Sequence, residues 1–464
     1  MTLNLLNING QTSRFENMKR ENFGSRFGVL MAMVGSAVGL GNMWRFPYMV
    51  SEHGGAAFIF VYILCVFCLC MPIFFAEFIV GRRSQSNAFG AFQKLAPGTG
   101  WKWVGLFAVI APLTILSYYS VIGGWSIQYL FKACTFGFTE RITQEYLDTM
   151  FAGFISSTWA PLLGHTLFLI TTALILVGGV KGGIERFGKV MMPLLYLLVL
   201  LIAVWTATLP GASEGFAFLF KPDLSKIDAS VCAAALGQSF FSLSLGYGTM
   251  LTYASYVSKK ENIATSSTTI AVSDLIFSLI ASCAIMPAVF AFGLNTQGGP
   301  GLVFETLPYI FSKMPLGGFA AILFFLALLV AALTSAISLY EVGVAYLVEE
   351  KNMSRKKAVA IIFSVTWPIG VICSLSFGPL SDMKIFGNIF FDFLDKLSAN
   401  YLMTIGSLLI VIFVGWKMKR PDVFDEFTNG GTLSGNARLF RVVWPFIRFV
   451  APLAVLMIFI SNLL

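Results

Sequence analysis

Met33-Val-Gly-Ser-Ala-Val-Gly-Leu-Gly-Asn-Met-Trp-Arg45 is the stretch that decides the fold, because it interrupts the first long apolar segment of the chain. Each glycine inside a helix costs about 1 kcal/mol relative to alanine, and Asn42 adds a polar amide. Backbone that leaves the helical hydrogen-bond ladder inside a membrane must be satisfied by protein, water or a bound ion. We therefore expect residues 35–42 to form an interrupted helix that lines a cavity.

The composition around this stretch is that of a membrane protein. The mean hydropathy is +0.80, and 57% of the 464 residues are hydrophobic against 12% that are charged, which excludes an ordinary soluble domain. A segment of about 20 apolar residues is long enough to cross a bilayer. The sequence contains eleven such segments, near residues 27–49, 56–80, 103–131, 160–179, 187–209, 231–256, 266–293, 317–347, 357–377, 389–416 and 439–461.

The net charge of +8 comes from loops beside these segments, and it therefore indicates orientation and not a nucleic-acid partner. Basic residues precede the first segment and follow every even-numbered one: Lys19 and Arg20, Arg82 and Arg83, Lys181 and Arg186, Lys259 and Lys260, Arg355 and Lys356, Lys417 and Arg420. The positive-inside rule places the N-terminus in the cytoplasm. An odd number of crossings then leaves the C-terminus outside.

Two sets of five segments are expected, each beginning with a glycine-interrupted helix, with the eleventh segment left over. The second interruption reads Gln238-Ser-Phe-Phe-Ser-Leu-Ser-Leu-Gly-Tyr-Gly248. An odd number of crossings per set forces the second set to enter from the opposite side, so the two sets would form an inverted repeat. Corresponding broken helices in two halves are the strongest sequence pointer to a transporter binding site.

Oxygen-bearing side chains recur on two of the later segments. Ala331, Thr334, Ser335 and Ser338 fall at i, i+3, i+4 and i+7 and share one helix face. Their hydroxyls can coordinate a hard cation, although a small-residue face for close helix packing is the alternative. Asp274 is a carboxylate at membrane depth, which usually marks an ion or proton path; a structural hydrogen bond is its alternative.

No catalytic arrangement emerges from the sequence. The only histidines are His53 and His165, and there is no nucleophile elbow, zinc-protease motif or phosphate loop. The seven cysteines show no pairing pattern and are expected to be structural. We therefore expect no enzyme, and energy for any transport would come from an ion gradient.

Gly35-Ser-Ala-Val-Gly-Leu-Gly-Asn-Met-Trp-Arg-Phe-Pro47, followed by Glu52-His-Gly-Gly55, resembles the first helix of the neurotransmitter:sodium symporters. The resemblance continues through Tyr119, the motif from Phe241 to Gly248, and Thr334-Ser335, and eleven crossings resemble the bacterial amino-acid transporters of the family. The midplane site between broken helices 1 and 6 is the general pattern of this family, and it is a standard illustration of transporter architecture.

The resemblance implies two sodium ions as cofactors. One would be held by the carbonyls of three residues and two hydroxyls: Gly35, Val38, Ala331, Thr334 and Ser335. The other would be held by Ala37, Asn42, Ser242 and Asp274. In the family the second ion also touches the substrate carboxylate, so that each charge lowers the electrostatic cost of the other.

The resemblance also implies an amino-acid site between helices 1, 3, 6 and 8. The carboxylate would meet backbone amides near Leu40 and Gly41 and the hydroxyl of Tyr119, and the ammonium would meet carbonyls around Ala37, Phe241 and Ser244. The side-chain pocket would be lined by Ile115, Phe241, Ser244, Tyr247, Ser335 and Leu339, with Ser242 nearby. Apolar and aromatic walls without a charge favour a neutral hydrophobic or aromatic amino acid.

The same resemblance implies two gates and a hinge in this chain. Arg45 and Asp395 would form the outer gate, and Arg20 and Glu349 the cytoplasmic gate, one methylene longer than the usual aspartate. Gly183 and Pro193 match a pattern of glycine, nine residues and proline that lets helix 5 unwind, with an ordinary proline kink as the alternative.

The prediction from the sequence is a sodium-coupled symporter in the inner membrane of a bacterium, working by alternating access. Asp274 supplies a fixed negative charge, so we expect independence of chloride, with a proton returning on Asp274 as an option. The expected organisation is a cytoplasmic tail (1–24), a transporter core (25–418) and a loop with helix 11 (419–464). The alternatives are a non-transporting sensor or scaffold that retains an amino-acid site, and an ion channel without a substrate.

Overall fold

The computed structural model describes residues 21–135, 138, 143–294 and 301–461. The first half contains α2 (Arg26–Ala37), η1 (Gly41–Arg45), α3 (Phe46–Glu52), α4 (Ala56–Cys65), η2 (Val66–Cys70), α5 (Met71–Ser84), α6 (Ala88–Leu95), α7 (Lys102–Cys134), α8 (Gln144–Ser156), α9 (Trp159–Val177), η3 (Val180–Glu185), α10 (Arg186–Thr206), α11 (Ala212–Phe220) and η4 (Leu224–Lys226).

The second half contains α12 (Ala229–Ser242), α13 (Thr249–Ser255), α14 (Ile263–Ala291), η5 (Leu302–Thr306), α15 (Leu307–Lys313), α16 (Gly317–Glu350), α17 (Arg355–Leu375), α18 (Phe390–Lys396), η6 (Leu397–Leu402), α19 (Met403–Ile412), η7 (Phe413–Lys417), α20 (Arg420–Thr428), α21 (Ser434–Pro445), η8 (Phe446–Val450) and α22 (Ala451–Ser461). The strands β1 (Lys384–Ile385) and β2 (Asn388–Ile389) pair antiparallel as a small hairpin.

Within the described residues, nine helices are long and apolar enough to cross a membrane, and α2 with η1 and α3 forms a tenth segment that bends by 51°. The remaining expected segment, 231–256, is divided into the short helices α12 and α13. Both helices that were expected to be broken are therefore interrupted in the structure. The count of eleven crossings and the inverted repeat stay predictions.

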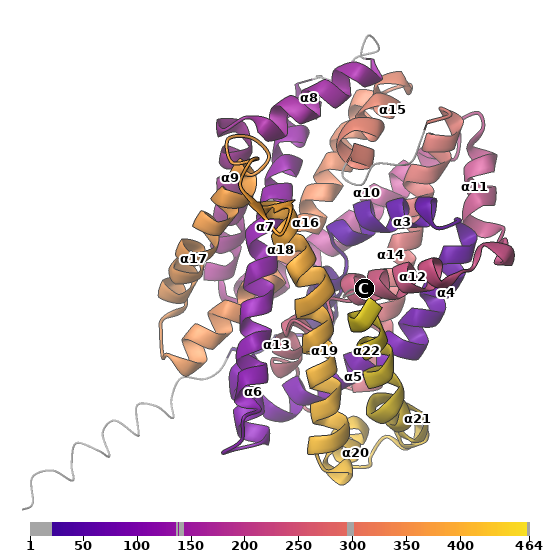
Figure 1. Cartoon of the computed structure of the whole chain (residues 1–464). Coiled ribbons are helices and arrows are strands. Elements are labelled where there is room, and N and C mark those ends of the chain that lie inside the picture. The colour runs from indigo at the N-terminus through magenta and orange to yellow at the C-terminus, as the bar shows by residue number, and fades with distance from the viewer. Residues whose placement is uncertain (1–20, 136–137, 139–142, 295–300, 462–464) are drawn as a thin grey trace, which may run out of the picture.

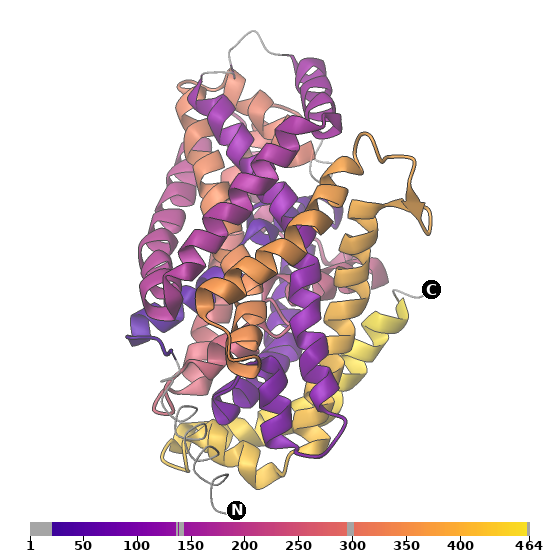
Figure 2. The same ribbon diagram turned by 90° about the vertical axis from the view of Figure 1, so that its left-hand side faces the viewer.

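The helices run side by side as one bundle, with α8 and α15 at one end and α6, α20 and α21 at the other (Figure 1). We call the second end the basic end, because it carries Arg82, Arg83 and Lys259 on the side where α20 packs. The last helix, α22, packs beside α19, and Figure 2 shows the same neighbours after a quarter turn.

Helices α7 and α16 lie at the centre of the bundle, where their contact buries most of both. Helix starts follow sequence signals: the Asp228 side chain accepts from the Val231 N–H at 2.8 Å, and Ser25 accepts from Gly28. The segment before α16 is helical as η5 and α15, and four of its apolar residues are buried: Phe304, Leu307, Ile310 and Phe311. All seven cysteines are free thiols.

Candidate functional site

The first interruption separates α2 from η1 at Val38 and Gly39. Val38 leaves the helical conformation with φ −78° and ψ 107°, which frees carbonyl groups of the preceding turn. Gly39 is required here, because a Cβ at this position would lie 2.2 Å from the Ser335 hydroxyl oxygen. The Leu40 N–H donates to the Tyr119 hydroxyl at 3.2 Å. The expected break therefore turns backbone groups toward α7 and α16.

The second interruption lies between α12 and α13. Ser244 has φ +55°, and Gly246 and Gly248 also have positive φ, so this connection adopts a conformation that a regular helix cannot. A Cβ at Gly246 would lie 2.1 Å from the Met403 carbonyl oxygen. The Gly246 N–H donates to Glu77 at 2.7 Å, and the Ser244 hydroxyl donates to the Ser36 carbonyl at 2.9 Å. The Ser244–Ser36 bond joins the two broken helices to each other, and the contacts of Gly246 fix the second break against α5 and α19.

One set of oxygen atoms converges between α2 and α16. The Thr334 hydroxyl lies 3.4 Å from the Val38 carbonyl and 3.0 Å from that of Ala331. The Ser335 hydroxyl lies 3.5 Å from the carbonyls of both Gly35 and Val38. The two hydroxyl groups carry only one proton each, which is too few for the three carbonyl oxygens of Gly35, Val38 and Ala331. A set of ligands that are all oxygen atoms suits a hard cation. The structure brings together all five residues that were expected to form this set.

A second polar cluster surrounds Asp274 in α14. The Asn42 amide nitrogen donates to Asp274 at 2.7 Å and to Ser242 at 3.0 Å, and the Ser242 hydroxyl lies 2.8 Å from the carboxylate. The Asn42 oxygen faces away and accepts from the Gly39 N–H at 2.9 Å. A cation beside Asp274 needs the amide to rotate, so that its oxygen replaces its nitrogen. Ala37 lines the adjoining cavity.

Two further residues join this cluster: Ser278, which continues a polar stripe on the helix of Asp274, and Tyr62, which the sequence did not single out. The Tyr62 hydroxyl donates to Asp274 at 3.3 Å, and the Ser278 hydroxyl accepts from the Asn42 amide at 2.8 Å. Ser278 follows Asp274 by one helical turn, a spacing visible in the sequence. Tyr62 lies in another helix, and nothing in the pattern of α4 singles it out. Asp274 is fully buried among donors, so its carboxylate is compensated without a neighbouring cationic side chain.

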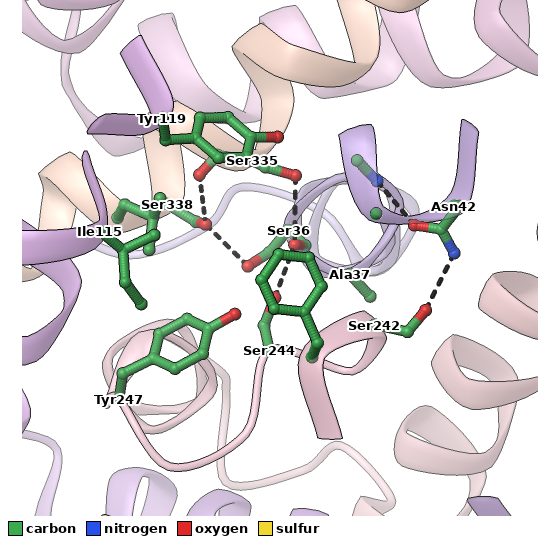
Figure 3. Close-up of a pocket in the computed structure, with 14 residues that line it drawn as sticks. Ser36, Ala37, Asn42, Ile115, Tyr119, Ser242, Ser244, Tyr247, Ser335 and Ser338 are labelled. Carbon is green, nitrogen blue, oxygen red and sulfur yellow. Dashed lines mark hydrogen bonds between the residues drawn. The ribbon is translucent and has the colours of Figure 1, made fainter. Parts of the chain in front are cut away.

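A cavity lies between the two breaks (Figure 3). It is lined by Ser36, Ala37, Gly39, Gly41, Asn42, Ile115, Tyr119, Phe241, Ser242, Ser244, Tyr247, Ser335, Ser338 and Leu339. Every expected pocket residue lines it except Leu40, whose N–H reaches the Tyr119 hydroxyl. No lining side chain carries a charge, so a ligand with two opposite charges must be held by backbone dipoles, hydroxyl groups and a bound ion.

Arg45, one of the two residues expected to form the outer gate, contacts a side chain that lines this cavity. The Arg45 guanidinium carbon is 4.8 Å from the centre of the Phe241 ring, in a cation–π contact. Arg45 and Asp395, both within the described residues, do not form a direct ion pair. Tyr118, which precedes the site tyrosine, bonds with Ser398 at 3.0 Å, and the Ser398 hydroxyl donates to the Asp395 carbonyl. The Phe241 ring is therefore in contact with Arg45, whereas the expected charge pair is separated.

At the basic end, the expected partner Arg20 lies outside the described residues. Glu349 accepts from the Asn87 N–H at 2.7 Å, at the start of α6. A different charge cluster lies deeper: Glu341 in α16 is fully buried and forms an ion pair with Arg355 at 2.5 Å. Glu341 also accepts from the Tyr256 hydroxyl at 2.8 Å, just after α13. This cluster was missed, although Glu341 follows Thr334 by seven residues on the same face.

The hinge residues of the fifth segment lie where expected along the chain. Gly183 is in the π-helical turn η3 and Pro193 is inside α10. The residue before the proline, Met192, packs against Gly35, where an added Cβ would lie 3.1 Å from the Met192 sulfur. Glu185 at the end of η3 accepts from the Gly24 N–H at 2.5 Å. The start of this segment thus contacts the residues that precede α2.

Within the described residues, no group of three His, Cys, Asp or Glu side chains is placed to hold a metal ion. The two polar clusters described above consist of carbonyl, hydroxyl and amide groups with the carboxylate of Asp274. Such ligands suit a hard, weakly bound cation and not a transition metal.

Comparison with known proteins identifies close relatives along nearly the whole chain. The model of the sodium:neurotransmitter symporter family matches residues 20–150 and 155–464. The uncharacterised sodium-dependent transporter YhdH of Bacillus subtilis is 39% identical over 94% of this chain and 96% of its own length. The human sodium- and chloride-dependent taurine transporter is 28% identical, over 76% of this chain and 65% of its own length.

Among solved structures, the crystal structure of MhsT in complex with L-phenylalanine superposes with a TM-score of 0.87. It shares 44% sequence identity with this chain and covers 96% of this chain and all of its own. The arrangement of helices described above is thus also that of MhsT in its complex with L-phenylalanine.

Proposed function

Because the chain belongs to the sodium:neurotransmitter symporter family, we propose that it transports a neutral hydrophobic or aromatic L-amino acid together with sodium. The observation that carries this proposal is the uncharged cavity between two broken helices, with converging oxygen atoms on two sides. A zwitterion in such a cavity needs a cation beside its carboxylate. Sodium supplies that charge, so binding of the two is coupled.

The two ions occupy separate sites in this proposal. The first lies among Gly35, Val38, Ala331, Thr334 and Ser335, which offer three carbonyl and two hydroxyl oxygens. The second lies among Ala37, Asn42, Ser242 and Asp274, next to the cavity. The second ion touches the substrate carboxylate, which is also held by the Tyr119 hydroxyl and the amides near Leu40 and Gly41.

The substrate ammonium meets the carbonyls around Ala37, Phe241 and Ser244, and its side chain lies among Ile115, Tyr247 and Leu339. MhsT, a solved structure with an amino acid bound, contains L-phenylalanine, which agrees with an aromatic substrate. Apolar walls with a few hydroxyl groups favour such a side chain over a charged one.

The transport cycle in this proposal is alternating access, in which the cavity opens to one side of the membrane at a time. We propose that four membrane segments rock against the rest of the bundle: segment 1 (α2 and α3), segment 2 (α4 and α5), segment 6 (α12 and α13) and segment 7 (α14). Arg45 and Asp395 form the outer gate in this proposal. At the basic end, Glu349 and the Glu341–Arg355 pair close the path, and unwinding at Gly183 and Pro193 opens it toward the first ion. The basic end faces the cytoplasm of a bacterial cell in this proposal.

A binding screen tests the function directly. The purified protein is heated with each of the twenty amino acids, in sodium and in potassium buffer. A ligand at 100 times its Kd stabilises the folded state by about 2.7 kcal/mol, so phenylalanine, tyrosine, tryptophan or leucine should raise the melting temperature only in sodium. Sodium-driven uptake into proteoliposomes then separates a transporter from a sensor, and current without amino-acid saturation would indicate a channel.

Removing one hydroxyl from the first ion site is expected to weaken sodium activation. Thr334→Val keeps the shape but deletes an oxygen that faces the Val38 carbonyl. We expect the sodium concentration for half-maximal uptake to rise by about tenfold, equal to about 1.4 kcal/mol. The control is Thr366→Val, because Thr366 is also buried and bonds only within its own helix at 2.9 Å. Unchanged sodium activation in Thr334→Val would refute this site.

Removing the Tyr119 hydroxyl is expected to weaken substrate binding and leave the fold intact. Tyr119→Phe loses a donor for the carboxylate and the contact with the Leu40 N–H. We expect Kd for the preferred amino acid to rise by about tenfold, because a hydrogen bond to a charged group contributes about 1.5–3 kcal/mol. Tyr129→Phe on the same helix is the control, since its hydroxyl has no hydrogen-bond partner among the described residues. Equal affinities for both variants would contradict the role.

A further inference from the structure

Arg448 is a cationic side chain in the last membrane-spanning segment, without an acidic partner in the described part of the chain. It lies in the π-helical turn η8, and its buried Nε has no hydrogen-bond partner. The sequence offers no nearby acid, because no Asp or Glu occurs between Asp395 and Asp422 or after Glu426. An unpaired ionisable group inside a membrane helix requires a partner from elsewhere.

The acidic residues of the nearest loop helix, α20, are already paired with other cations. Glu426 binds Arg82 at 2.6 Å and Lys259 at 3.1 Å. Asp422 binds Arg83 at 2.9 Å. These carboxylates compensate charges at the end of α5 and after α13, and Arg448 is not among their partners.

Two aromatic rings hold the Arg448 guanidinium at the outer surface of the bundle. Its central carbon is 4.8 Å from the centre of the Trp416 ring and 5.4 Å from that of Phe449. The two aromatic residues are 58% and 50% exposed, so the cation lies at the lipid-facing surface and not in a protein interior. Cation–π contacts orient a guanidinium but do not neutralise its charge.

The position of this group is fixed by the crossing of two helices. The Trp416 indole N–H donates to the Arg448 carbonyl at 2.9 Å. A Cβ at Gly415 would lie 3.0 Å from the Arg448 Cα, so glycine permits the close approach. Both helices have a π-helical turn at this crossing, η7 and η8, and such turns are frequent at functional sites.

The depth of the group matches the headgroup layer at the basic end. Trp416 is followed by Lys417, Lys419 and Arg420, where the apolar helix stops. Tryptophan is enriched at membrane–water interfaces, and arginine reaches toward them from helix ends. Beyond the guanidinium, Phe449, Leu453 and Met457 form an exposed apolar row at i, i+4 and i+8 along the last helix.

We propose that Arg448, Trp416 and Phe449 form a binding site for the phosphate group of an anionic phospholipid in the leaflet at the basic end. The planar guanidinium donates two parallel hydrogen bonds to phosphate oxygens while its face stays on the rings. The acyl chain lies along the row of Phe449, Leu453 and Met457. The transport cavity has no charged side chain, whereas this site holds its ligand with a fixed cation. The site does not depend on the proposed substrate.

Native mass spectrometry of the full-length protein in detergent tests the site, with phosphatidylglycerol and phosphatidylcholine of identical acyl chains as probes. The wild-type protein should retain phosphatidylglycerol preferentially. Arg448→Gln should weaken that retention by about tenfold, equal to about 1.4 kcal/mol. Arg441→Gln is the matched control, an exposed arginine seven residues earlier on the same helix, and it should change retention less than about twofold, below 0.5 kcal/mol.

Arg448→Lys distinguishes a planar site from a charged surface, because lysine keeps the charge but not the paired donors. Its retention should be intermediate, and thermal unfolding should show that all three variants are folded. The proposal is overturned by unchanged retention in Arg448→Gln, by an equal loss in Arg441→Gln, or by equal binding of the two lipids. Displacement of the lipid by excess inorganic phosphate would assign the site to a soluble anion and would also overturn it.

Discussion

Replacing Asp274 with asparagine is expected to abolish sodium-driven uptake in chloride-free buffer and to make the remaining activity depend on chloride. In the structure, Ser242, Tyr62 and Asn42 all donate toward this carboxylate, which is the only charged acceptor that the cluster contains. Asparagine removes the charge but keeps the size. The second sodium then loses its counter-charge, and the donors of Ser242 and Tyr62 lose their anionic acceptor.

The expected loss is large because the site is buried. Hydrogen bonds to charged groups contribute about 1.5–3 kcal/mol each, so the loss of one or two corresponds to a decrease in uptake of about a hundredfold or more. A chloride ion among the same donors can replace the missing charge, so uptake by Asp274→Asn should partly recover in sodium chloride. Wild-type uptake should be equal in chloride and gluconate.

The measurement is sodium-driven uptake of the preferred amino acid in proteoliposomes, with gluconate or chloride as the only anion. Asp382→Asn is the matched control, because Asp382 is exposed in a loop far along the chain from the site. Full activity of Asp274→Asn in gluconate would exclude Asp274 as the counter-charge. Chloride dependence of the wild-type protein would exclude the proposed independence.

Asp274 also offers a test of proton return. When sodium and substrate leave, the carboxylate remains in a cavity without a cation, and uptake of a proton is one way to lower that cost. A pH-sensitive dye inside the vesicles should report loss of internal protons during sodium-driven uptake by the wild-type protein. Transport at full rate with no such signal would remove proton antiport from the proposal.

The positions of the two breaks could be predicted from the sequence because glycine and polar side chains are poor choices for a helix in lipid. The stretch around Gly39 and that around Gly246 stand out for this local reason, and both are interrupted in the structure. The stripe of Thr334 and Ser335 follows from helical periodicity. The prediction of which residues face each other across the cavity rested on the family resemblance, because no local sequence pattern places Tyr119 against Leu40.

Other parts of the site depend on contacts between distant segments, and these could not be predicted from local patterns. Tyr62 looks like any aromatic residue of an apolar helix, yet it donates to Asp274. The separation of Arg45 from Asp395 depends on the Phe241 ring taking the guanidinium. The Arg448 site was missed because a lone arginine in an apolar segment looks like an ordinary interfacial anchor, and its contact with Trp416 of another helix is visible only in the structure.

Breaking the Glu341–Arg355 pair is expected to have the largest effect on stability. Glu341 is fully buried and accepts from Tyr256 as well as from Arg355, whose Nε donates to the Leu176 carbonyl at 2.6 Å. This one cluster thus joins α16 and α17 to the end of α9 and to the residue that follows α13. Removing one partner of a buried ion pair typically costs 3–5 kcal/mol, since it leaves an uncompensated charge.

The cycle of Glu341→Leu, Arg355→Met and the double variant separates stability from gating. Each single variant should lower the melting temperature strongly, whereas the double variant should recover most of it, because apolar groups of similar volume can replace a buried pair at little cost. Lys356→Met, an exposed neighbour of Arg355, is the control and should melt like the wild-type protein. Single variants that melt at the wild-type temperature would show that the pair is not tightly buried.

Uptake by the double variant then decides what the cluster does beyond holding helices together. In the double variant Tyr256 has lost the Glu341 acceptor, so this link between the far half of the second broken helix and α16 is missing even though no buried charge is left unpaired. We therefore expect recovered stability but impaired transport, with faster hydrogen exchange in α13 than in the wild-type protein. Recovery of both stability and uptake would mean that the pair is structural, and closure at the basic end would then rest on Glu349 and its partners.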